Sequence, residues 1–255
     1  MRFRLKSICC LAIAASCAIT ACAPSDPRHV STLSPEARLQ LAEAADASGD
    51  SDLAIAMYSA AAASAPSNVA LQLRCADALA RSGKIGQARQ LLMDRLHQNR
   101  GQPDLIRALA LVDLVAGQPA EAIAQFDRIL ARNPRDVRAL GDKAVALDLL
   151  GQHATAQATY REVLALTPND PAATNNLAVS MMLEGHIHQA LETLEPMQDA
   201  GTSPPRLKVN LGILYALNGN AEQSRQLLGD LVSDGDLSAL TRALSSSATG
   251  ARPGP

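Results

Sequence analysis

Hydrophobic residues recur along this chain at helical spacing and, over a longer distance, with a period of 34 residues. Leu140, Ala144 and Leu147 stand three or four residues apart, a spacing that places them on one face of an α-helix. Six glycines follow the longer period without slippage: Gly49, Gly83, Gly117, Gly151, Gly185 and Gly219. A fixed period of this length indicates helical units that stack against one another.

Three more columns of residues keep the same period. Five residues after each glycine stands a small side chain, namely Ala54, Ala88, Ala122, Ala156, Ala190 and Ser224. Four residues further stands a large apolar one, namely Tyr58, Leu92, Phe126, Tyr160, Leu194 and Leu228. Seven residues before each glycine stand Ala42, Ala76, Ala110, Ala144, Ala178 and Gly212.

Each column has a physical reason. Small residues let paired helices approach closely, and the large residue fills the space left in the next layer. Glycine ends the first helix of each unit, because a left-handed backbone costs glycine little and other residues more. The pairs Ser34-Pro35 and Asp170-Pro171 have the order of an N-cap followed by proline at the first helical position.

The pattern therefore predicts an all-α fold, a right-handed α-solenoid of about six helix pairs over residues 35–238. Residues 237–244 are expected to form a short C-terminal capping helix over the last apolar face. Residues 239–255 hold the remnant of this cap and a Ser-, Gly- and Pro-rich tail that is expected to be disordered.

The N-terminus has the pattern of a secretory signal peptide. Three basic residues precede an apolar run from Ile8 to Ala21, which at 14 residues is shorter than the ~20 that a membrane-spanning helix needs. The sequence Ile19-Thr20-Ala21-Cys22 resembles the lipobox of bacterial lipoproteins. That resemblance implies a signal peptide at residues 1–21 and a diacylglyceryl group on Cys22, which would become the first residue. A plain signal peptide that contains a cysteine is the alternative.

Residues 22–34 are expected to be the lipidated cysteine and a tether, of which about 11 residues reach at most ~40 Å. In lipoproteins of bacteria with two membranes, an aspartate after the cysteine commonly retains the protein at the inner membrane. Ala23 stands there instead. The resemblance thus implies a lipid anchor at the periplasmic face of the outer membrane, with a surface-exposed lipoprotein as the alternative.

Charge and cysteine content further limit the possible partners and covalent links of the protein. Removal of Arg2, Arg4 and Lys6 from the 23 basic residues leaves 20 against 25 acidic ones, a net charge of −5 that disfavours nucleic acid as a partner. Three of the five cysteines lie within residues 1–21 and Cys22 would be acylated, so Cys75 alone remains and no internal disulfide is available. Cys75 is expected to be a small buried hydrophobe rather than a reactive thiol.

No catalytic or phosphate-binding signature occurs in the sequence. Ser82-Gly83-Lys84 lacks the upstream glycine of a phosphate-binding loop. His186 and His188 could suggest a metal, but no further ligands stand nearby in sequence, and solvated turn histidines are the preferred interpretation. We therefore expect no enzyme, no cofactor, no metal and no small-molecule substrate.

The columns resemble the tetratricopeptide repeat, with the pattern W-x₂-L-G-x₂-Y…A-x₃-F…P, over residues 35–238. The tryptophan column is weak here, and Arg95 occupies a position that is usually small. The resemblance implies a concave groove, lined by the first helix of each pair, that holds a protein or peptide partner. The groove residues so implied are Leu73, Arg74, Asp77, Arg107, Leu111, Asp142, Val145, Asp148, Asn175, Asn176, Val179, Val209, Asn210 and Ile213.

Asn176 and Asn210 are equivalent, 34 residues apart, and occupy the place where asparagines of peptide-binding arrays often hold a ligand's main chain. An amide suits this role because it donates and accepts at once. The alternative is that either asparagine bonds a neighbouring helix.

Signal, lipobox, tether and repeats together resemble the lipoproteins of pilus and secretion assembly, and in particular the TadD family of the tight-adherence (Flp) pilus system. The segments that carry this resemblance are Asn175-Asn176-Leu177-Ala178 with Gly185, Leu194-Glu195-Pro196-Met197, Asn210-Leu211-Gly212 and Tyr215-Ala216-Leu217. The resemblance implies a binding role in pilus or secretin assembly. The alternatives are a pilotin for a type IV pilus or type II secretion secretin, and an envelope adaptor that docks peptidoglycan-remodelling enzymes.

Overall fold

The structure is a computed structural model that describes residues 33–198 and 205–229, together with residues 233, 235, 236, 238, 239 and 242. Over these residues the chain forms only helices, which confirms the predicted all-α solenoid. Their bounds are α2 (Pro35–Ser48), α3 (Ser51–Ser64), α4 (Val69–Arg81), α5 (Ile85–Gln98), α6 (Pro103–Val115), α7 (Pro119–Leu130), α8 (Val137–Leu149), α9 (His153–Leu166), α10 (Pro171–Leu183), α11 (Ile187–Leu194), the 3₁₀ helix η1 (Glu195–Met197), α12 (Pro205–Leu217) and α13 (Ala221–Leu228).

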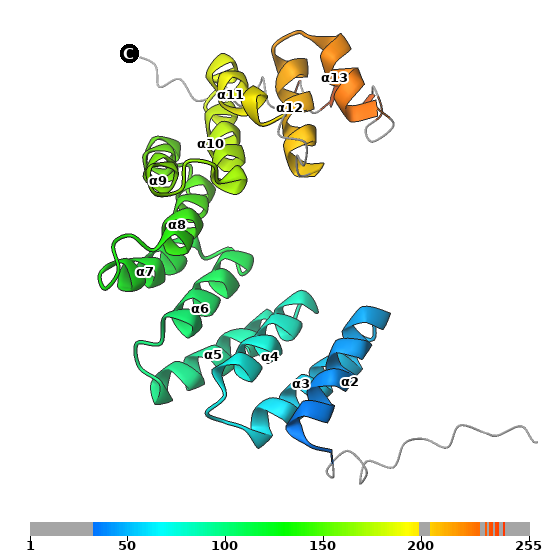
Figure 1. Ribbon diagram of the computed structural model, residues 1–255, viewed down its shortest axis with the longest axis vertical. Helices are drawn as coiled ribbons and strands as arrows, with labels where there is room; N and C mark the ends of the chain where they lie inside the picture. Colours follow the sequence, from blue (N-terminus) through cyan, green and yellow to red (C-terminus); the bar gives the residue numbers. More distant parts are fainter. Residues whose placement is uncertain are drawn as a thin grey trace, which may run out of the picture.

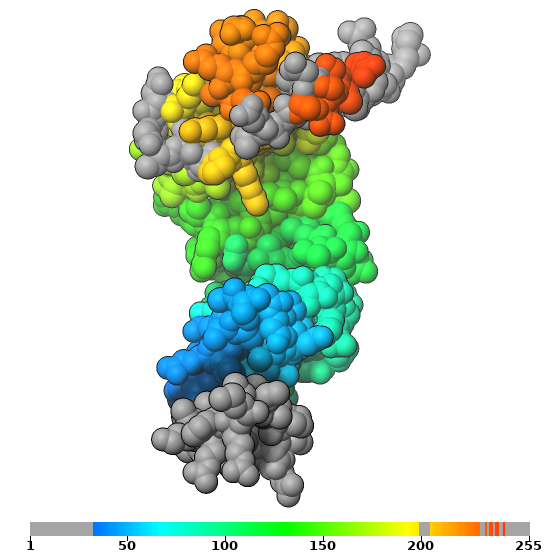
Figure 2. Space-filling model, turned by 90° about the vertical axis from the view of Figure 1, so that its right-hand side faces the viewer, coloured from blue at the N-terminus to red at the C-terminus, as the bar shows by residue number. Residues whose placement is uncertain are grey.

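The helices pair as the 34-residue period predicts. We call α2, α4, α6, α8, α10 and α12 the A helices, and α3, α5, α7, α9, α11 and α13 the B helices. Each helix packs mainly against the next one along the chain, and neighbouring A helices also touch. Figure 1 shows the pairs following one another in an arc, with α6 and α8 on its inner side and α7 and α9 on its outer side. From the side the same stack is one elongated body, ordered from α2 to α13 (Figure 2).

Local chemistry fixes where these helices begin and end. The Ser34 hydroxyl accepts from the backbone N–H of Ala37 at 3.2 Å, and the Asp170 carboxylate accepts from two N–H groups of the first turn of α10. Both are N-caps followed by proline, as predicted. All six periodic glycines follow an A helix with φ between 73° and 84°, the left-handed conformation that glycine adopts most readily.

The small and large columns form the core. All six small residues are at most 1% exposed and all six large ones at most 2% exposed. Ala42, Ala76, Ala110, Ala144 and Ala178 are buried in the same way, so helices approach at alanine and the large side chains fill the next layer. The column ends at Gly212, where a Cβ would meet the Leu228 side chain at 2.6 Å.

Two charged residues replace apolar ones at the junction of the second and third pairs. Asp113 stands where Leu79 and Leu147 stand in other repeats; it is 1% exposed, and the Arg89 Nε donates to it at 2.7 Å. Arg95 stands where Ala61 and other repeats have buried apolar residues, and its Nε is buried without a hydrogen-bond partner in the described chain. This junction is therefore the least regular interface of the array.

Some expectations concern residues that the structure leaves out. The predicted signal peptide, Cys22 and nearly all of the tether lie outside the described residues, as do the tail and most of residues 237–244. Within the described part of the chain, no helix is both long enough and apolar enough to span a bilayer.

Candidate functional site: the groove of the A helices

The A helices form one face of the solenoid, on which a groove lies between α4 and α6. A cavity of about 550 Å³ lies there. Leu73, Asp77, Arg107 and Leu111, all expected in the groove, line it. Val115 and Arg138, which the sequence prediction did not include, line it as well.

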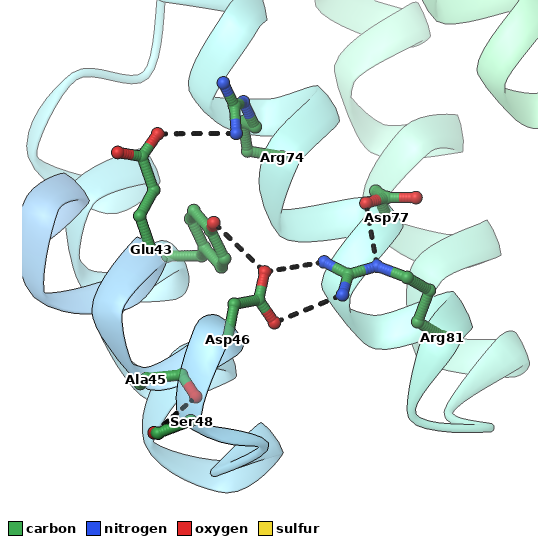
Figure 3. Close-up of polar contacts among 8 residues, drawn as sticks. Glu43, Ala45, Asp46, Ser48, Arg74, Asp77 and Arg81 are labelled. Atoms are coloured by element: carbon green, nitrogen blue, oxygen red, sulfur yellow. Dashed lines mark hydrogen bonds and ion pairs between the residues drawn. The ribbon is translucent and has the colours of Figure 1, made fainter.

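The first two A helices present charges that are paired across repeats. Both terminal nitrogens of Arg81 bond the Asp46 carboxylate, at 2.7 and 3.2 Å, while its Nε bonds Asp77 at 3.0 Å (Figure 3). Arg74 lies 3.4 Å from Glu43. The hydrogen bonds from Arg81 hold the pKa of Asp46 below its ordinary value. The predicted groove residues Arg74 and Asp77 thus belong to a network that joins α2 to α4.

The middle of the groove repeats this arrangement. The Arg107 Nε donates to the Asp142 carboxylate at 2.6 Å, from α6 to α8. Burial raises the pKa of Asp142, while the positive charge and hydrogen bond of Arg107 act in the opposite direction. Asp46–Arg81 and Arg107–Asp142 each join residues 35 positions apart, one more than the repeat. Other contacts between neighbouring A helices have different separations, such as Arg74–Glu43 with 31 residues and Arg138–Asp104 with 34, so the charged links do not share one register.

From α6 onward the same surface becomes apolar. Each A helix carries two apolar residues four positions apart, namely Leu111 and Val115, Val145 and Leu149, Val179 and Leu183, and Ile213 and Leu217. The second members include three of the most exposed large hydrophobic residues: Val115 is 67% exposed, Leu149 61% and Leu183 40%. In the first two A helices the equivalent pairs are Glu43 and Ala47, and Asp77 and Arg81. We call these eight residues of α6 to α12 the apolar stripe.

Sequence reasoning found the first member of each pair but missed Val115, Leu149, Leu183 and Leu217. The signal was present, because all four stand two residues before a periodic glycine. An apolar residue at helical spacing is usually part of the core, and only the structure shows that this column faces outward.

The groove asparagines form a relay between α10 and α12. The Asn210 Nδ2 donates to the Asn175 Oδ1 at 2.8 Å, and the Asn175 Nδ2 donates to the Asn176 Oδ1 at 3.3 Å. Asn210 therefore bonds a neighbouring helix, which was the alternative to ligand binding. The Asn176 Nδ2 has no hydrogen-bond partner among the described residues, so its contact with a ligand remains a prediction.

Asp148 on α8 is engaged by residues of two neighbouring helices. Its carboxylate accepts from the Ser180 hydroxyl at 2.6 Å and lies 2.8 Å from the His153 Nδ1. Burial and the charge of this carboxylate raise the pKa of Tyr160. Asp148 thus links α8 to α9 and α10, and its contact with a partner remains a prediction.

The remaining candidate residues show no reactive arrangement. His186 is the N-cap residue of α11, where its Nδ1 lies 3.6 Å from Glu184, and the Nδ1 of His188 lies 3.3 Å from Glu192. Among the described residues, no three potential metal ligands gather in one place. Cys75 is 3% exposed, and burial raises the pKa of its thiol, which confirms it as a small buried hydrophobe.

A stack of helix hairpins with a groove along its A helices is a scaffold for protein–protein contacts, and the comparisons agree with this class. Two family models, both described as tetratricopeptide repeat, match residues 47–112 and 107–180, together more than half of the chain. The chain belongs to the tetratricopeptide repeat proteins. A comparison with curated proteins finds no match.

Solved structures share this fold at low sequence identity. A tetratricopeptide repeat protein from Parabacteroides merdae superposes with a TM-score of 0.68 at 17% identity, over 89% of this chain and 86% of that one. PilW, a widely conserved type IV pilus biogenesis factor, gives 0.67 at 22%, over 81% and 98%. The pilF protein of Pseudomonas aeruginosa gives 0.62 at 15%, over 82% and 97%. At these identities the likeness establishes the fold.

Proposed function

We propose that this chain is a non-enzymatic scaffold, anchored by lipid in the bacterial envelope, whose groove holds a protein segment during pilus (Flp/Tad-type) or secretin assembly. The observation that carries the binding role is the apolar stripe. Three of its eight side chains, Val115, Leu149 and Leu183, are 40% exposed or more, on three successive A helices. The other five, Leu111, Val145, Val179, Ile213 and Leu217, pack partly against the core, so the stripe is a periodic apolar surface that the fold leaves incompletely covered.

The geometry of the stripe suggests the kind of segment that fits. Packed helices lie roughly 8–10 Å apart, so each A helix offers an apolar pair at about that interval. An extended chain in the polyproline II conformation rises ~3.1 Å per residue and turns once every three residues. A segment with an apolar side chain at about every third position would therefore meet successive pairs, while the free amide of Asn176 could donate to its main chain.

The pilus role has separate support. The segments around Asn176 and Asn210 resemble the TadD family, and PilW and the Pseudomonas pilF protein share the fold. Two of the three structural relatives reported above thus carry pilus-related names. A groove that holds one protein segment suits an assembly factor that brings a secretin or pilus component to its place.

The proposed location in the envelope is supported by the predicted signal peptide and the residues that follow it. A charged start, a short apolar run and Ile19-Thr20-Ala21-Cys22 support lipidation of Cys22, and Ala23 supports transfer to the outer membrane. Metabolic labelling with a clickable palmitate analogue should mark the wild-type chain and not Cys22→Ser. Fractionation should place the wild type with the outer membrane.

Crosslinking pulldown from envelopes tests the binding role. We expect secretin or pilus components to be enriched with the wild type and lost with Leu149→Asp combined with Leu183→Asp, because a charge on the stripe must be desolvated when the partner binds. Leu53→Asp is the matched control, since Leu53 is 38% exposed but lies on the B helix α3.

The outcomes separate the candidates. Enrichment of peptidoglycan hydrolases or synthases instead would favour the envelope adaptor. If neither pilus proteins nor secretin are enriched, the assembly role is wrong. If the stripe variant binds as well as Leu53→Asp, the groove is not the binding surface.

A further inference from the structure

A second hollow lies on the opposite side of α6 from the groove. It has a volume of about 410 Å³ and opens between the B helices α5 and α7. Its apolar floor is made of Met93, Leu96 and Leu109, of which Leu109 is buried. Because residues four and seven positions apart share a helix face, Ala108, Leu111 and Val115 line the groove while Leu109 faces away from it. The two hollows have no lining residue in common.

The rim of this hollow is cationic. His97 and Arg100 approach from the end of α5, and Arg128 and Arg132 from the end of α7. No carboxylate lines the hollow, and none of the four cationic side chains has an ion-pair partner among the described residues. The hydrogen bonds of the rim are neutral: Arg128 donates to the Gln125 side chain at 2.6 Å, and Arg132 donates to the Gly101 carbonyl at 2.6 Å.

Many basic side chains elsewhere in the described array lie within 4 Å of a carboxylate, namely Arg74, Arg81, Lys84, Arg89, Arg107, Arg138 and Lys143. Others in the described array, such as Arg135 and Arg161, have no such ion pair either, so the distinguishing feature of the hollow is that four cationic side chains gather around one apolar floor. The nearest acids in sequence have other partners or form no ion pair with the rim: Asp94 accepts from Gln90, Asp104 lies 3.9 Å from Arg138, and Asp127 bonds Lys143. Asp136 lines an adjoining hollow with Arg128 and Arg132, and its carboxylate caps α8 by accepting from the Ala139 N–H. Three arginines therefore keep most of their N–H donors available to an external anion.

Part of the rim is held in place before any ligand binds. Gly101 has φ of 86°, and a Cβ at this position would overlap the Arg132 guanidinium. The glycine thus lets the loop between α5 and α6 lie against Arg132 and accept its hydrogen bond. A guanidinium that is already oriented loses less freedom when it binds an anion.

We propose that this hollow is a second binding site, which takes an acidic peptide segment carrying a bulky apolar side chain. The carboxylates pair with Arg100 and Arg128, and the apolar side chain covers Met93 and Leu109. A recessed apolar floor inside a cationic rim suits an inserted side chain better than the flat surface of an anionic bilayer. The site would let the scaffold hold one protein segment in the groove and a second, acidic one on its outer side.

The test uses fluorescence anisotropy with the full mature chain and a labelled peptide, Gly-Asp-Glu-Leu-Phe-Glu-Asp-Gly. Arg100→Gln with Arg128→Gln is the test variant, because Arg100 has no hydrogen bond in the described chain and Arg128 bonds only Gln125 of its own helix. Arg161→Gln is the matched control, an exposed arginine on α9 outside the hollow. The same peptide with Asn and Gln in place of the acids controls for charge.

We expect the acidic peptide to bind the wild type and the Arg161 variant equally. It should bind the double variant at least about tenfold more weakly, because two charge-assisted contacts are lost. A tenfold change in affinity corresponds to about 1.4 kcal/mol. Leu149→Asp should leave this binding unchanged, which separates the outer site from the groove. Equal binding to the double variant, or equal binding of the amide peptide, would overturn the proposal. So would binding to phosphatidylglycerol vesicles without binding to the peptide, because that result would assign the rim to a membrane.

Discussion

The hydroxyl of Tyr58 on α3 donates a hydrogen bond of 3.2 Å to the carboxylate of Asp46 on α2. Tyr160 and Asp148 stand at the equivalent positions three repeats later, with the same separation of 12 residues, and burial together with the Asp148 carboxylate raises the pKa of Tyr160. The other repeats have no tyrosine in this column, and the residues that replace the aspartate there are Ala80, Leu114, Met182 and Ala216. The acid therefore accompanies the tyrosine, because a buried phenol needs an acceptor.

This pairing predicts that opposite substitutions at equivalent positions both destabilise the fold. Tyr58→Phe should lower the free energy of unfolding by about 1 kcal/mol, the typical net value of one hydrogen bond. Phe126→Tyr should destabilise the fold as well, because Leu114 offers the new hydroxyl no acceptor, and adding Leu114→Asp should recover part of the loss. Urea denaturation of these three variants and of Leu114→Asp alone measures this; additive effects in the double variant would show that the two positions are not coupled.

The buried pair Arg89–Asp113 predicts two substitutions of opposite sign. Arg89→Ala should destabilise the array by ~1–3 kcal/mol, because it leaves the carboxylate of Asp113 buried without a donor. Asp113→Leu should be neutral or stabilising, since leucine occupies the equivalent position in the neighbouring repeats, as Leu79 and Leu147. Thermal and urea unfolding compare the two. If Asp113→Leu costs as much as Arg89→Ala, the pair contributes net stability to the junction.

Two glycines of α8 and the turn after it form a matched test of backbone conformation. Gly151 has φ of 73° with nothing within 4 Å of an added Cβ, so Gly151→Ala should destabilise by ~1–2 kcal/mol through backbone strain alone. Gly141 lies within α8 and is equally uncrowded, so Gly141→Ala should stabilise by ~0.5–1 kcal/mol. Equal effects in urea unfolding would contradict a conformational role for the periodic glycines.

The groove carboxylates predict how stability depends on pH. Hydrogen bonds from Arg81 lower the pKa of Asp46 from 3.8, so its contribution is present above the unfolded pKa and is lost as pH falls through the folded one. Burial raises the pKa of Asp142, so ionisation of Asp142 weakens the fold as pH rises. In urea unfolding from about pH 2 to about pH 6, Asp46→Asn should flatten the acid limb and Asp142→Asn should steepen it. The Asp46 effect should vanish in an Arg81→Gln background.

Much of the fold could be predicted because side-chain size and backbone conformation determine it locally. In any array of this period, a small residue such as Ala88 lies where helices approach and a large one such as Leu92 fills the next layer. A glycine such as Gly83 ends its helix, because it adopts the left-handed conformation readily. The groove could also be placed, because it lies on a fixed face of each A helix.

The partners of individual groove residues could not be predicted, since they depend on the relative shift of neighbouring helices. Asn175 bonds Asn210 and Arg107 bonds Asp142 across 35 residues, while the sequence suggests pairs 34 apart. Asp113 illustrates the same limit. A charge in an apolar column is visible in the sequence, but its pairing with Arg89, 24 residues earlier on α5, follows only from the packed junction.

The first two A helices carry Glu43 with Ala47 and Asp77 with Arg81 at the positions where α8, α10 and α12 carry the apolar stripe, and this change along one column gives the groove a polarity. A protein segment with one hydrophilic and one hydrophobic end therefore has a single favourable direction along the groove. Its hydrophilic end then points to α2, the helix nearest to Cys22 in the sequence. With the proposed lipid on Cys22, a partner held in this way would meet the bilayer with the same end first every time.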